Sequence, residues 1–282
     1  MKMNSMESEE PVRMTGDETP HSGFLIVNAD DWGRDGLNTN STLDCVLRGA
    51  VSAVSAMVLM EDSERAAGIS RELEIDTGLH LNLTSPFTVP ACPSKLLEHQ
   101  QRLSKYLNGS RFARVMFHPG LFSSFEYVVK AQFEEFDRLY ATAPQRIDGH
   151  HHVHLCANVL LAKLLPEGAV VRRNFSFQRG EKSFPNRVYR RAVDRILARR
   201  HRLVDFFYSL SPMSVPGRIE RIIRLASDHI VELETHPVNP DEHRYLAEGE
   251  IFNWLGNTRI APFRSLPLTS ELDQGWVAFS KI

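Results

Sequence analysis

Cysteine is scarce in this 282-residue chain, and the spacing of the few cysteines excludes two common uses of the residue. Cys45, Cys92 and Cys156 stand far apart, and none belongs to a CxxC pair. An odd number without paired spacing argues against a disulfide framework and against a zinc site built from thiolates. We expect all three to be small apolar residues of a protein core.

Long apolar runs are also missing. The longest reach about ten residues and contain Ala and Ser, whereas a membrane-spanning helix needs about 20, so the sequence predicts no membrane span. Residues 1–22 are acidic and lack an apolar segment, which argues against a secretory signal. We expect a disordered tail there, followed by one folded domain over residues 23–282, in a cytoplasmic protein.

An excess of charge of either sign is the third absence. The chain has 33 Lys and Arg against 35 Asp and Glu, a formal net charge of -2. Without a basic field, nucleic acid is not an expected partner. The exception is local, because residues 186–200 carry six arginines on a predicted helix. A solvated helix face is the first interpretation, and a surface for a lipid, a phosphate or a dimer partner is the alternative.

Short apolar runs alternate with helical patterns along the chain. The predicted strands are residues 24–27, 52–59, 77–83, 146–150, 169–172, 203–208, 230–234 and 260–263. The predicted helices are residues 38–48, 64–71, 123–140, 157–165, 186–200 and 217–226, the third opened by a capping box at Ser123 and Glu126. This alternation is typical of a parallel sheet and predicts an α/β barrel of seven or eight strands. Residues 84–122 are expected to be an irregular excursion on the active face.

Ionisable side chains cluster at the carboxyl ends of the predicted strands, which share one face of a parallel barrel. The densest segment is 148–154, DGHHHVH. Asp148, His150, His152 and His154 have the same parity, so an extended segment would direct them to the same side. Neutral imidazole is the commonest metal ligand, and carboxylates orient it. A metal or catalytic role is therefore favoured over a histidine-rich polar loop.

Asp30 and Asp31 end the first predicted strand. Adjacent carboxylates are costly to bury without partners, but a metal would let one act as a ligand and the other as a proton acceptor. An exposed turn before Gly33 is the alternative. His80 alternates with leucines in the third strand, where a satisfied core histidine is the usual interpretation. Because the aspartate pair and the histidine-rich segment still lack a third metal ligand, the interpretation of His80 as that ligand is favoured instead.

Glu234 and His236 end a late strand and are candidates for an acid/base pair. Arg172 could bind a substrate anion, orient a carboxylate or form a structural salt bridge. One Asp with two His makes a mixed oxygen and nitrogen site, which suits zinc and, less predictably, magnesium, manganese or cobalt. Such a metal lowers the pKa of bound water and polarises a carbonyl. These residues predict metal-assisted hydrolysis, most simply of an amide.

Six segments occur in a recognisable order: 27–31 (VNADD), 49–55 (GAVSAVS), 78–84 (GLHLNLT), 131–132 (AQ), 147–154 (IDGHHHVH) and 234–237 (ETHP). With them the sequence resembles the YdjC-like family of carbohydrate deacetylases, which includes chitooligosaccharide deacetylases. The resemblance implies a distorted parallel (β/α) barrel related to NodB-type deacetylases. It also implies one divalent metal, a homodimer, and removal of the acetyl group from an N-acetylated sugar.

The resemblance assigns roles by position. The implied metal ligands are Asp31, His80 and His150. Asp30 matches the catalytic base, and His236 matches a late histidine that we assign to the general acid. The positions that match the rim of the site, where they would orient ligands or contact sugar, are Asp148, His152 and His154.

Four departures from the family pattern stand at Trp32, Gly149, Ser85-Pro86 and Val238. None removes an implied ligand or base, but the changes after Thr84 and at Val238 would line the sugar cleft and affect which acetylated sugar fits. Two other functions remain open. An amidohydrolase-type barrel would carry His-x-His on its first strand, where this chain has Asp-Asp. A non-catalytic carbohydrate- or metal-binding relative would be expected to lack Asp30.

Overall fold

The computed structural model describes residues 23–110, 112–177 and 181–266, so the tail predicted over residues 1–22 lies outside the described residues. Seven strands form one sheet in the order β5-β4-β3-β2-β1-β7-β6. They are β1 (Phe24–Trp32), β2 (Ala53–Ala56), β3 (Thr77–Leu81), β4 (Arg146–Gly149), β5 (Val170–Val171), β6 (Phe206–Ser209) and β7 (Ile230–Thr235). Every neighbouring pair is parallel, as the alternation of strands and helices predicts.

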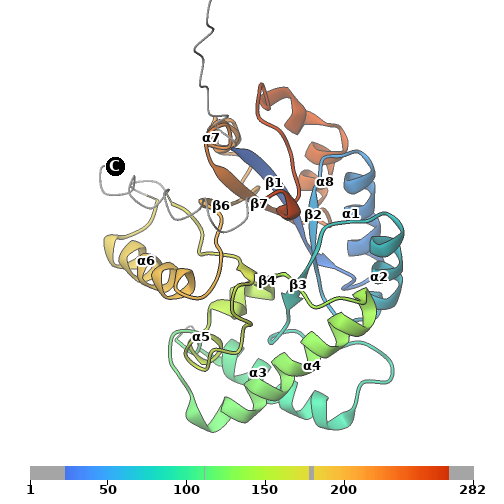
Figure 1. Cartoon of the computed structure of the whole chain (residues 1–282), viewed down its shortest axis with the longest axis vertical. Coiled ribbons are helices and arrows are strands. Elements are labelled where there is room, and N and C mark those ends of the chain that lie inside the picture. Colours follow the sequence, from blue (N-terminus) through green and yellow to red (C-terminus); the bar gives the residue numbers. More distant parts are fainter. Residues whose placement is uncertain (1–22, 111, 178–180, 267–282) are drawn as a thin grey trace, which may run out of the picture.

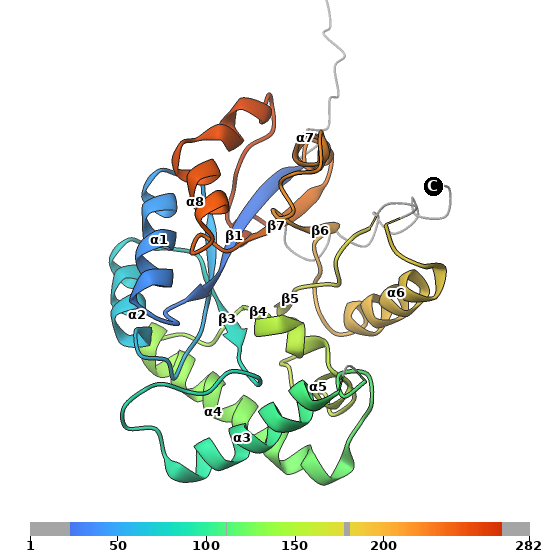
Figure 2. The same cartoon turned by 180° about the vertical axis from the view of Figure 1, so that it is seen from behind.

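The sheet curls into a half-barrel with the helices around it (Figure 1, and Figure 2 from behind). The helices are α1 (Gly36–Leu47), α2 (Ser63–Glu72), α3 (Ser94–Gly109), α4 (Phe122–Tyr140), α5 (Ala157–Leu161), α6 (Phe184–Ala198), α7 (Arg218–Leu225) and α8 (Pro240–Ala247). Val170 of β5 forms an isolated parallel bridge with Arg202, in the segment that leads into β6. This bridge links the two edges of the sheet on the amino-terminal side of β6.

The distorted parallel barrel predicted from the sequence is confirmed, with seven strands in the described part of the chain. The eighth candidate, residues 260–263, is reduced to an isolated bridge between Ile260 and Leu25. The described residues include no helix with the length and apolar character needed to cross a membrane.

Side-chain alternation along β1 divides the core in two. Phe24 and Ile26 belong to a small apolar cluster that also includes residues of β2, β5 and β7. Leu25 and Val27 belong to the large core that includes the apolar faces of the surrounding helices. The interior row of β1 is thus apolar at the start of the strand, and its next positions are polar.

Three local predictions were wrong. The irregular excursion contains the 16-residue helix α3. The capping box does not form, because Ser123 lies inside α4, whose N-cap is Leu121. Helix α8 was missed, although Asn239 caps it by accepting a hydrogen bond from the backbone N–H of Asp241. The cysteine prediction fits better, since Cys45 and Cys156 are buried and Cys92 is partly buried.

Candidate metal and acid/base site

Asp30 and Asp31 lie together, although neighbours on a regular strand point to opposite faces. Asp31 has a φ of 64°, in the left-handed region, and the pairing of β1 with β2 changes register between Ala29 and Trp32. Aspartate tolerates this conformation better than most residues do. The irregularity brings both carboxylates to one place, while the indole N–H of Trp32 donates to the carbonyl of Ala66 in α2 at 3.2 Å.

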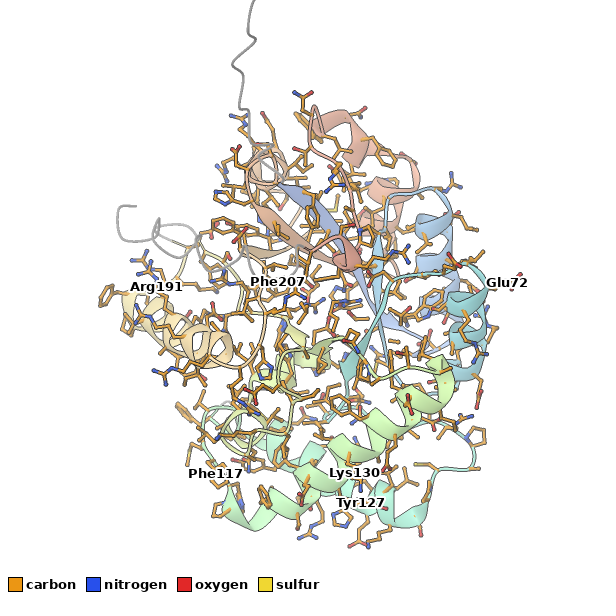
Figure 3. The ribbon with its side chains drawn as sticks, viewed as in Figure 1. Glu72, Phe117, Tyr127, Lys130, Arg191 and Phe207 are labelled. Atoms are coloured by element: carbon orange, nitrogen blue, oxygen red, sulfur yellow. The ribbon has the colours of Figure 1, made fainter. Side chains whose placement is uncertain are left out.

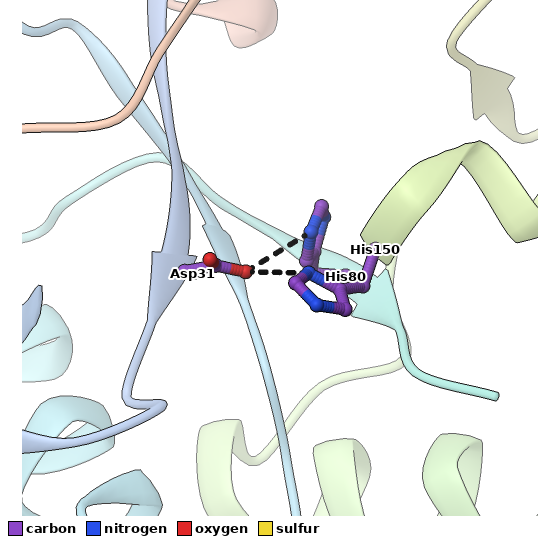
Figure 4. A group of neighbouring side chains, drawn as sticks. All are labelled: Asp31, His80 and His150. Carbon is purple, nitrogen blue, oxygen red and sulfur yellow. Dashed lines mark ion pairs between the residues drawn. The ribbon is translucent and has the colours of Figure 1, made fainter. Parts of the chain in front are cut away.

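Asp31, His80 and His150 form a compact group where β1, β3 and β4 end (Figure 4). Asp31 Oδ1 is 3.4 Å from His80 Nε2 and 2.9 Å from His150 Nδ1. All three residues are buried, and one potential ligand atom from each lies within 4.8 Å of the others. The structure therefore brings together the three residues nominated as metal ligands from the sequence.

The donor atoms of this group fit a divalent cation. Asp31 Oδ1 is buried without an acceptable hydrogen bond, despite its nearness to His150, whereas Oδ2 accepts one from Arg34 at 2.9 Å. Ligands about 2.1 Å from a shared cation stand about 3.0–3.4 Å apart. The separation of Asp31 Oδ1 from His80 lies at the upper end of this range, and its separation from His150 lies 0.1 Å below the lower end. One carboxylate oxygen with two imidazole nitrogens is a donor set that zinc accepts and that several other divalent metals can use.

Asp148 orients His80. The Nδ1 of His80 donates to Asp148 Oδ1 at 2.7 Å, which leaves Nε2 facing Asp31. A carboxylate that holds the far nitrogen of a histidine in this way is typical of metal sites. Burial opposes a charged imidazole, but Asp30 and Asp148 raise the pKa of His80 to about 10. A cation that binds Nε2 must displace the proton from this atom.

Arg172 is a buried cation that faces four carboxylates. Its two terminal nitrogens donate to the two oxygens of Asp30 at 2.7 Å, and its Nε donates to Glu232 at 2.6 Å. It lies 2.9 Å from Asp148 and 3.3 Å from Glu234. Burial alone would raise the pKa of Asp30, but Arg172 and the neighbouring imidazolium outweigh burial and lower this pKa to about 2. Asp30 is thus held in its ionised form.

The two glutamates of β7 hold their protons more tightly. Burial raises the pKa of Glu232 to about 7 in spite of Arg172. Burial and the charge of Asp30 raise the pKa of Glu234 as well. Asp30 and Glu234 are therefore neighbouring carboxyl groups whose pKa values are pushed apart, an arrangement that suits one for accepting a proton and the other for holding it.

The histidine-rich segment is not extended, so the parity argument for it was wrong. β4 ends at Gly149, and residues 150–155 form a 3₁₀ segment in which His151 and His152 have positive φ values of 55° and 56°. His150 still reaches Asp31. His154 is buried, and its Nε2 donates to the carbonyl of Arg172 at 2.9 Å. Burial lowers the pKa of His154 to about 4, so this ring is neutral at pH 7.

His152 lies at the edge of the group. Its Nε2 is 3.7 Å from Glu234 Oε1. Its ring meets Phe175 edge to face with centroids 4.7 Å apart, and Phe175 stacks on Phe207 at 4.5 Å. A partly exposed imidazole thus stands next to the carboxyl group of Glu234, and an aromatic side chain packs against that imidazole.

His236 is close to the same carboxylates. Potential ligand atoms of Asp30, Glu234 and His236 lie within 4.8 Å of one another. The backbone N–H of His236 donates to Glu242 Oε2 at 2.7 Å, and the hydroxyl of Ser211 donates to the other oxygen of Glu242 at 2.5 Å. Helix α8 therefore fixes the segment after β7, a function that the sequence analysis missed along with the helix.

A polar layer next to the site was also missed. The hydroxyl of Ser55 donates to Asp148 Oδ2 at 2.5 Å and accepts from the amide of Asn28 at 2.8 Å and from Arg146 at 2.9 Å. Gly78 leaves room for this layer, because a Cβ there would lie 2.7 Å from Arg146 Cζ. The signal available in the sequence was a polar residue at an interior position of an otherwise apolar strand.

Comparisons with known proteins agree on one family. The family model described as YdjC-like protein matches residues 24–259. A chitooligosaccharide deacetylase of Serratia marcescens is 33% identical over 133 residues, which are 47% of this chain and 51% of that protein. A carbohydrate deacetylase of Danio rerio is 30% identical over 139 residues, 48% of this chain and 43% of that protein. The chain thus matches about half the length of these relatives.

Among solved structures, one from Enterococcus faecalis V583, provisionally assigned as a cellobiose-phosphate cleavage protein, aligns with a TM-score of 0.59. It is 18% identical, and the alignment covers 86% of this chain and 98% of that one. At this identity the likeness concerns the fold alone, and it agrees with the curled parallel sheet. The match to the family model runs from the first strand through the last and includes every candidate site residue, so the chain belongs to the YdjC-like protein family.

Proposed function

We propose that this protein is a metal-dependent hydrolase that removes the acetyl group from an N-acetylated sugar. The observation that carries the proposal is the pairing of two groups at one end of the barrel. Asp31, His80 and His150 offer a cation site, and Asp30 lies beside it, ionised and held by Arg172. The names of the curated relatives, a chitooligosaccharide deacetylase and a carbohydrate deacetylase, support the sugar and the acetyl group.

A divalent cation at this site would supply Lewis-acid activation of water and of the amide carbonyl. Asp30 accepts the proton of the attacking water as the new C–O bond forms, because Arg172 keeps this carboxylate ionised. His236 gives a proton to the amine nitrogen as the C–N bond breaks. The products are acetate and a free amino sugar.

Glu234 supports the proton transfers. Its carboxyl group lies within 4.8 Å of both the base and the acid, in the group formed by Asp30, Glu234 and His236, and its raised pKa keeps a proton available there. Arg172 has a positioning function, since it holds Asp30 through two hydrogen bonds of 2.7 Å. Asp148 positions His80 in the same manner.

A cavity of about 310 Å³ offers room for sugar, and one of its lining residues, Phe175, also contacts His152 at the edge of the site. Its lining includes Phe175, Tyr208 and Ser209. Ser209 is the register partner of Glu234, and Phe175 touches His152. Ligand sites typically combine aromatic surface with a few polar groups. We propose that the sugar ring lies here, with its acetamido group directed to Asp30.

Acetate release from a panel of N-acetylated sugars tests the proposal. The protein is first treated with a chelator and then supplied with zinc, magnesium, manganese or cobalt. We expect release with at least one metal and none without. Stoichiometric metal binding with no release from any substrate would favour a non-catalytic binding protein. The homodimer and the cytoplasmic location stay predictions.

Asp30→Asn gives the sharper experiment. The variant should bind the metal like the parent chain but lose about 10²–10⁴-fold in rate, the usual contribution of a general base. Asp241→Asn is the matched control, because that carboxylate lies on the exposed side of α8. If Asp30→Asn keeps full activity, the assignment of the base is wrong.

A further inference from the structure

Helix α6 lies to one side of the barrel, at the left in Figure 1 and at the right in Figure 2. Its inner face buries Val193, Asp194 and Leu197. Its outer face exposes a stripe at helical spacings of three or four residues. The stripe consists of Phe184, Val188, Arg191, Arg195 and Arg199, and it is referred to below as the α6 stripe.

The charge of the α6 stripe is entirely positive. Asp194, the acidic residue of α6, is turned inward and binds the backbone N–H of Asn174 and the guanidinium of Arg173. Among the described residues, no carboxylate lies within ion-pair distance of Arg191, Arg195 or Arg199, although many other arginines of the chain have one. In a chain of net charge -2, this stripe is a local cationic surface.

The same stripe exposes large apolar side chains. Phe184 is 70% exposed and Val188 47%, and the adjacent Ile196 is 43% exposed. A phenylalanine this far into water, one turn from a valine on the same face, contributes nothing to the core. Apolar residues occupy the first half of the stripe, and arginines occupy the second half.

We propose that the α6 stripe binds the surface of an anionic phospholipid bilayer. Lipid phosphates would accept hydrogen bonds from the three guanidinium groups, while Phe184 and Val188 enter the boundary between headgroups and acyl chains. Helices with basic and aromatic residues on exposed faces bind membranes in this way. A second copy of the chain fits less well, because a two-fold contact centred on the stripe would place the two copies of Arg191 against each other.

A second exposed apolar segment supports a bilayer over a small ligand. Val115, Met116 and Phe117 are all more than two-fifths exposed, and Figure 3 shows Phe117 on the same left-hand side of the molecule as Arg191. The neighbouring Arg114 donates to the backbone carbonyl of His151 at 2.7 Å. A flat, extended partner can touch both α6 and this segment.

Sedimentation of the full chain with lipid vesicles tests the proposal. The vesicles contain phosphatidylcholine with or without phosphatidylglycerol. We expect binding only to the anionic vesicles, weakening as salt rises. Each basic side chain near such a surface strengthens binding about fivefold. The triple variant R191E/R195E/R199E should therefore bind at least about 100-fold more weakly, and F184S/V188S should also bind more weakly.

The matched control is R102E/R224E/R244E, which changes the net charge equally on α3, α7 and α8. It should keep most of the binding, and circular dichroism should show all variants folded. The proposal is overturned if the parent chain does not bind anionic vesicles at low salt, or if both triple variants lose binding equally. It is also overturned if the α6 variant changes only the oligomeric state, since the stripe would then be an interface between copies.

Discussion

Replacing Arg172 with methionine tests the electrostatic account of the site most directly. The substitution keeps much of the volume and removes a cation that contacts Asp30, Asp148, Glu232 and Glu234 together. Removing one partner of a buried ion pair generally costs about 3–5 kcal/mol, because the other charge is left uncompensated. We expect a loss of this size at pH 8, or about 6–20 °C in Tm for a domain of this length.

The pKa values of the neighbouring carboxyl groups predict how the stability deficit of this variant changes with pH. In the parent chain, Arg172 counteracts burial and lowers the pKa values of Asp30 and Asp148 below 3.8. Their stabilisation is therefore present above pH 3.8 and is lost as the pH falls through the folded-state values. Without Arg172 these pKa values rise. The variant can then protonate its carboxylates in mild acid, so its deficit should shrink between pH 8 and pH 5.

Urea unfolding at pH 8, 6.5 and 5, with a chelator present, measures the free energy of unfolding at each pH. Arg172→Lys serves as a second variant, because it keeps a charge but cannot bind Asp30 through a planar fork. It should fall between the parent chain and Arg172→Met. Arg224→Met, on exposed α7, controls for the loss of an arginine. A deficit below about 1 kcal/mol at pH 8, or an equal deficit at pH 5, would refute the reasoning.

Three further predictions concern other residues of the site. Metal binding should release a proton from His80, whose pKa is about 10 in the metal-free protein. Calorimetry in buffers of different protonation enthalpy would detect the released proton, and a binding enthalpy independent of the buffer would contradict the release. His154 has a folded-state pKa of about 4 against 6.5 for the free side chain. It should therefore remove about 3 kcal/mol from the free energy of unfolding as the pH falls from 6.5 to 4. In acid unfolding, His154→Leu should lose less stability over that range than the parent chain. Phe175→Ala should raise KM more than it lowers kcat in the acetate assay, with the exposed Phe252→Ala as control; a fall in kcat alone would place Phe175 outside the sugar site.

The strand pattern could be predicted because it depends on local composition. Short strand patterns, such as the apolar residues 24–27 and the alternating apolar and acidic residues 230–234, lie inside β1 and β7. Parallel topology then requires their carboxyl ends to share a face. The meeting of Asp31 with His80 and His150 follows from that rule together with the ligand chemistry of the side chains.

Other features depend on contacts that are distant in sequence or on single backbone angles. The left-handed conformations of Asp31, His151 and His152 break the alternation on which parity arguments rely. Arg172 left three interpretations open because its partners come from β1, β4 and β7, and only tertiary structure shows which groups surround it. Neither Ser55, which ends the 49–55 segment, nor Glu242 could be assigned a function from the sequence, because their importance lies in the neighbours that they bind.

The pairing of β1 with β7 has a consequence for biosynthesis. β1 is complete once Trp32 has been translated, but its partner β7 begins about 200 residues later, at Ile230. At the usual 5–20 residues per second, the ribosome needs about 10–40 s to supply it. Throughout that interval one edge of β1 has no strand to pair with, and Asp30 lacks Glu234 and His236. A nascent chain of this protein therefore has to shield an aggregation-prone edge for tens of seconds, which makes it a candidate client for ribosome-associated chaperones.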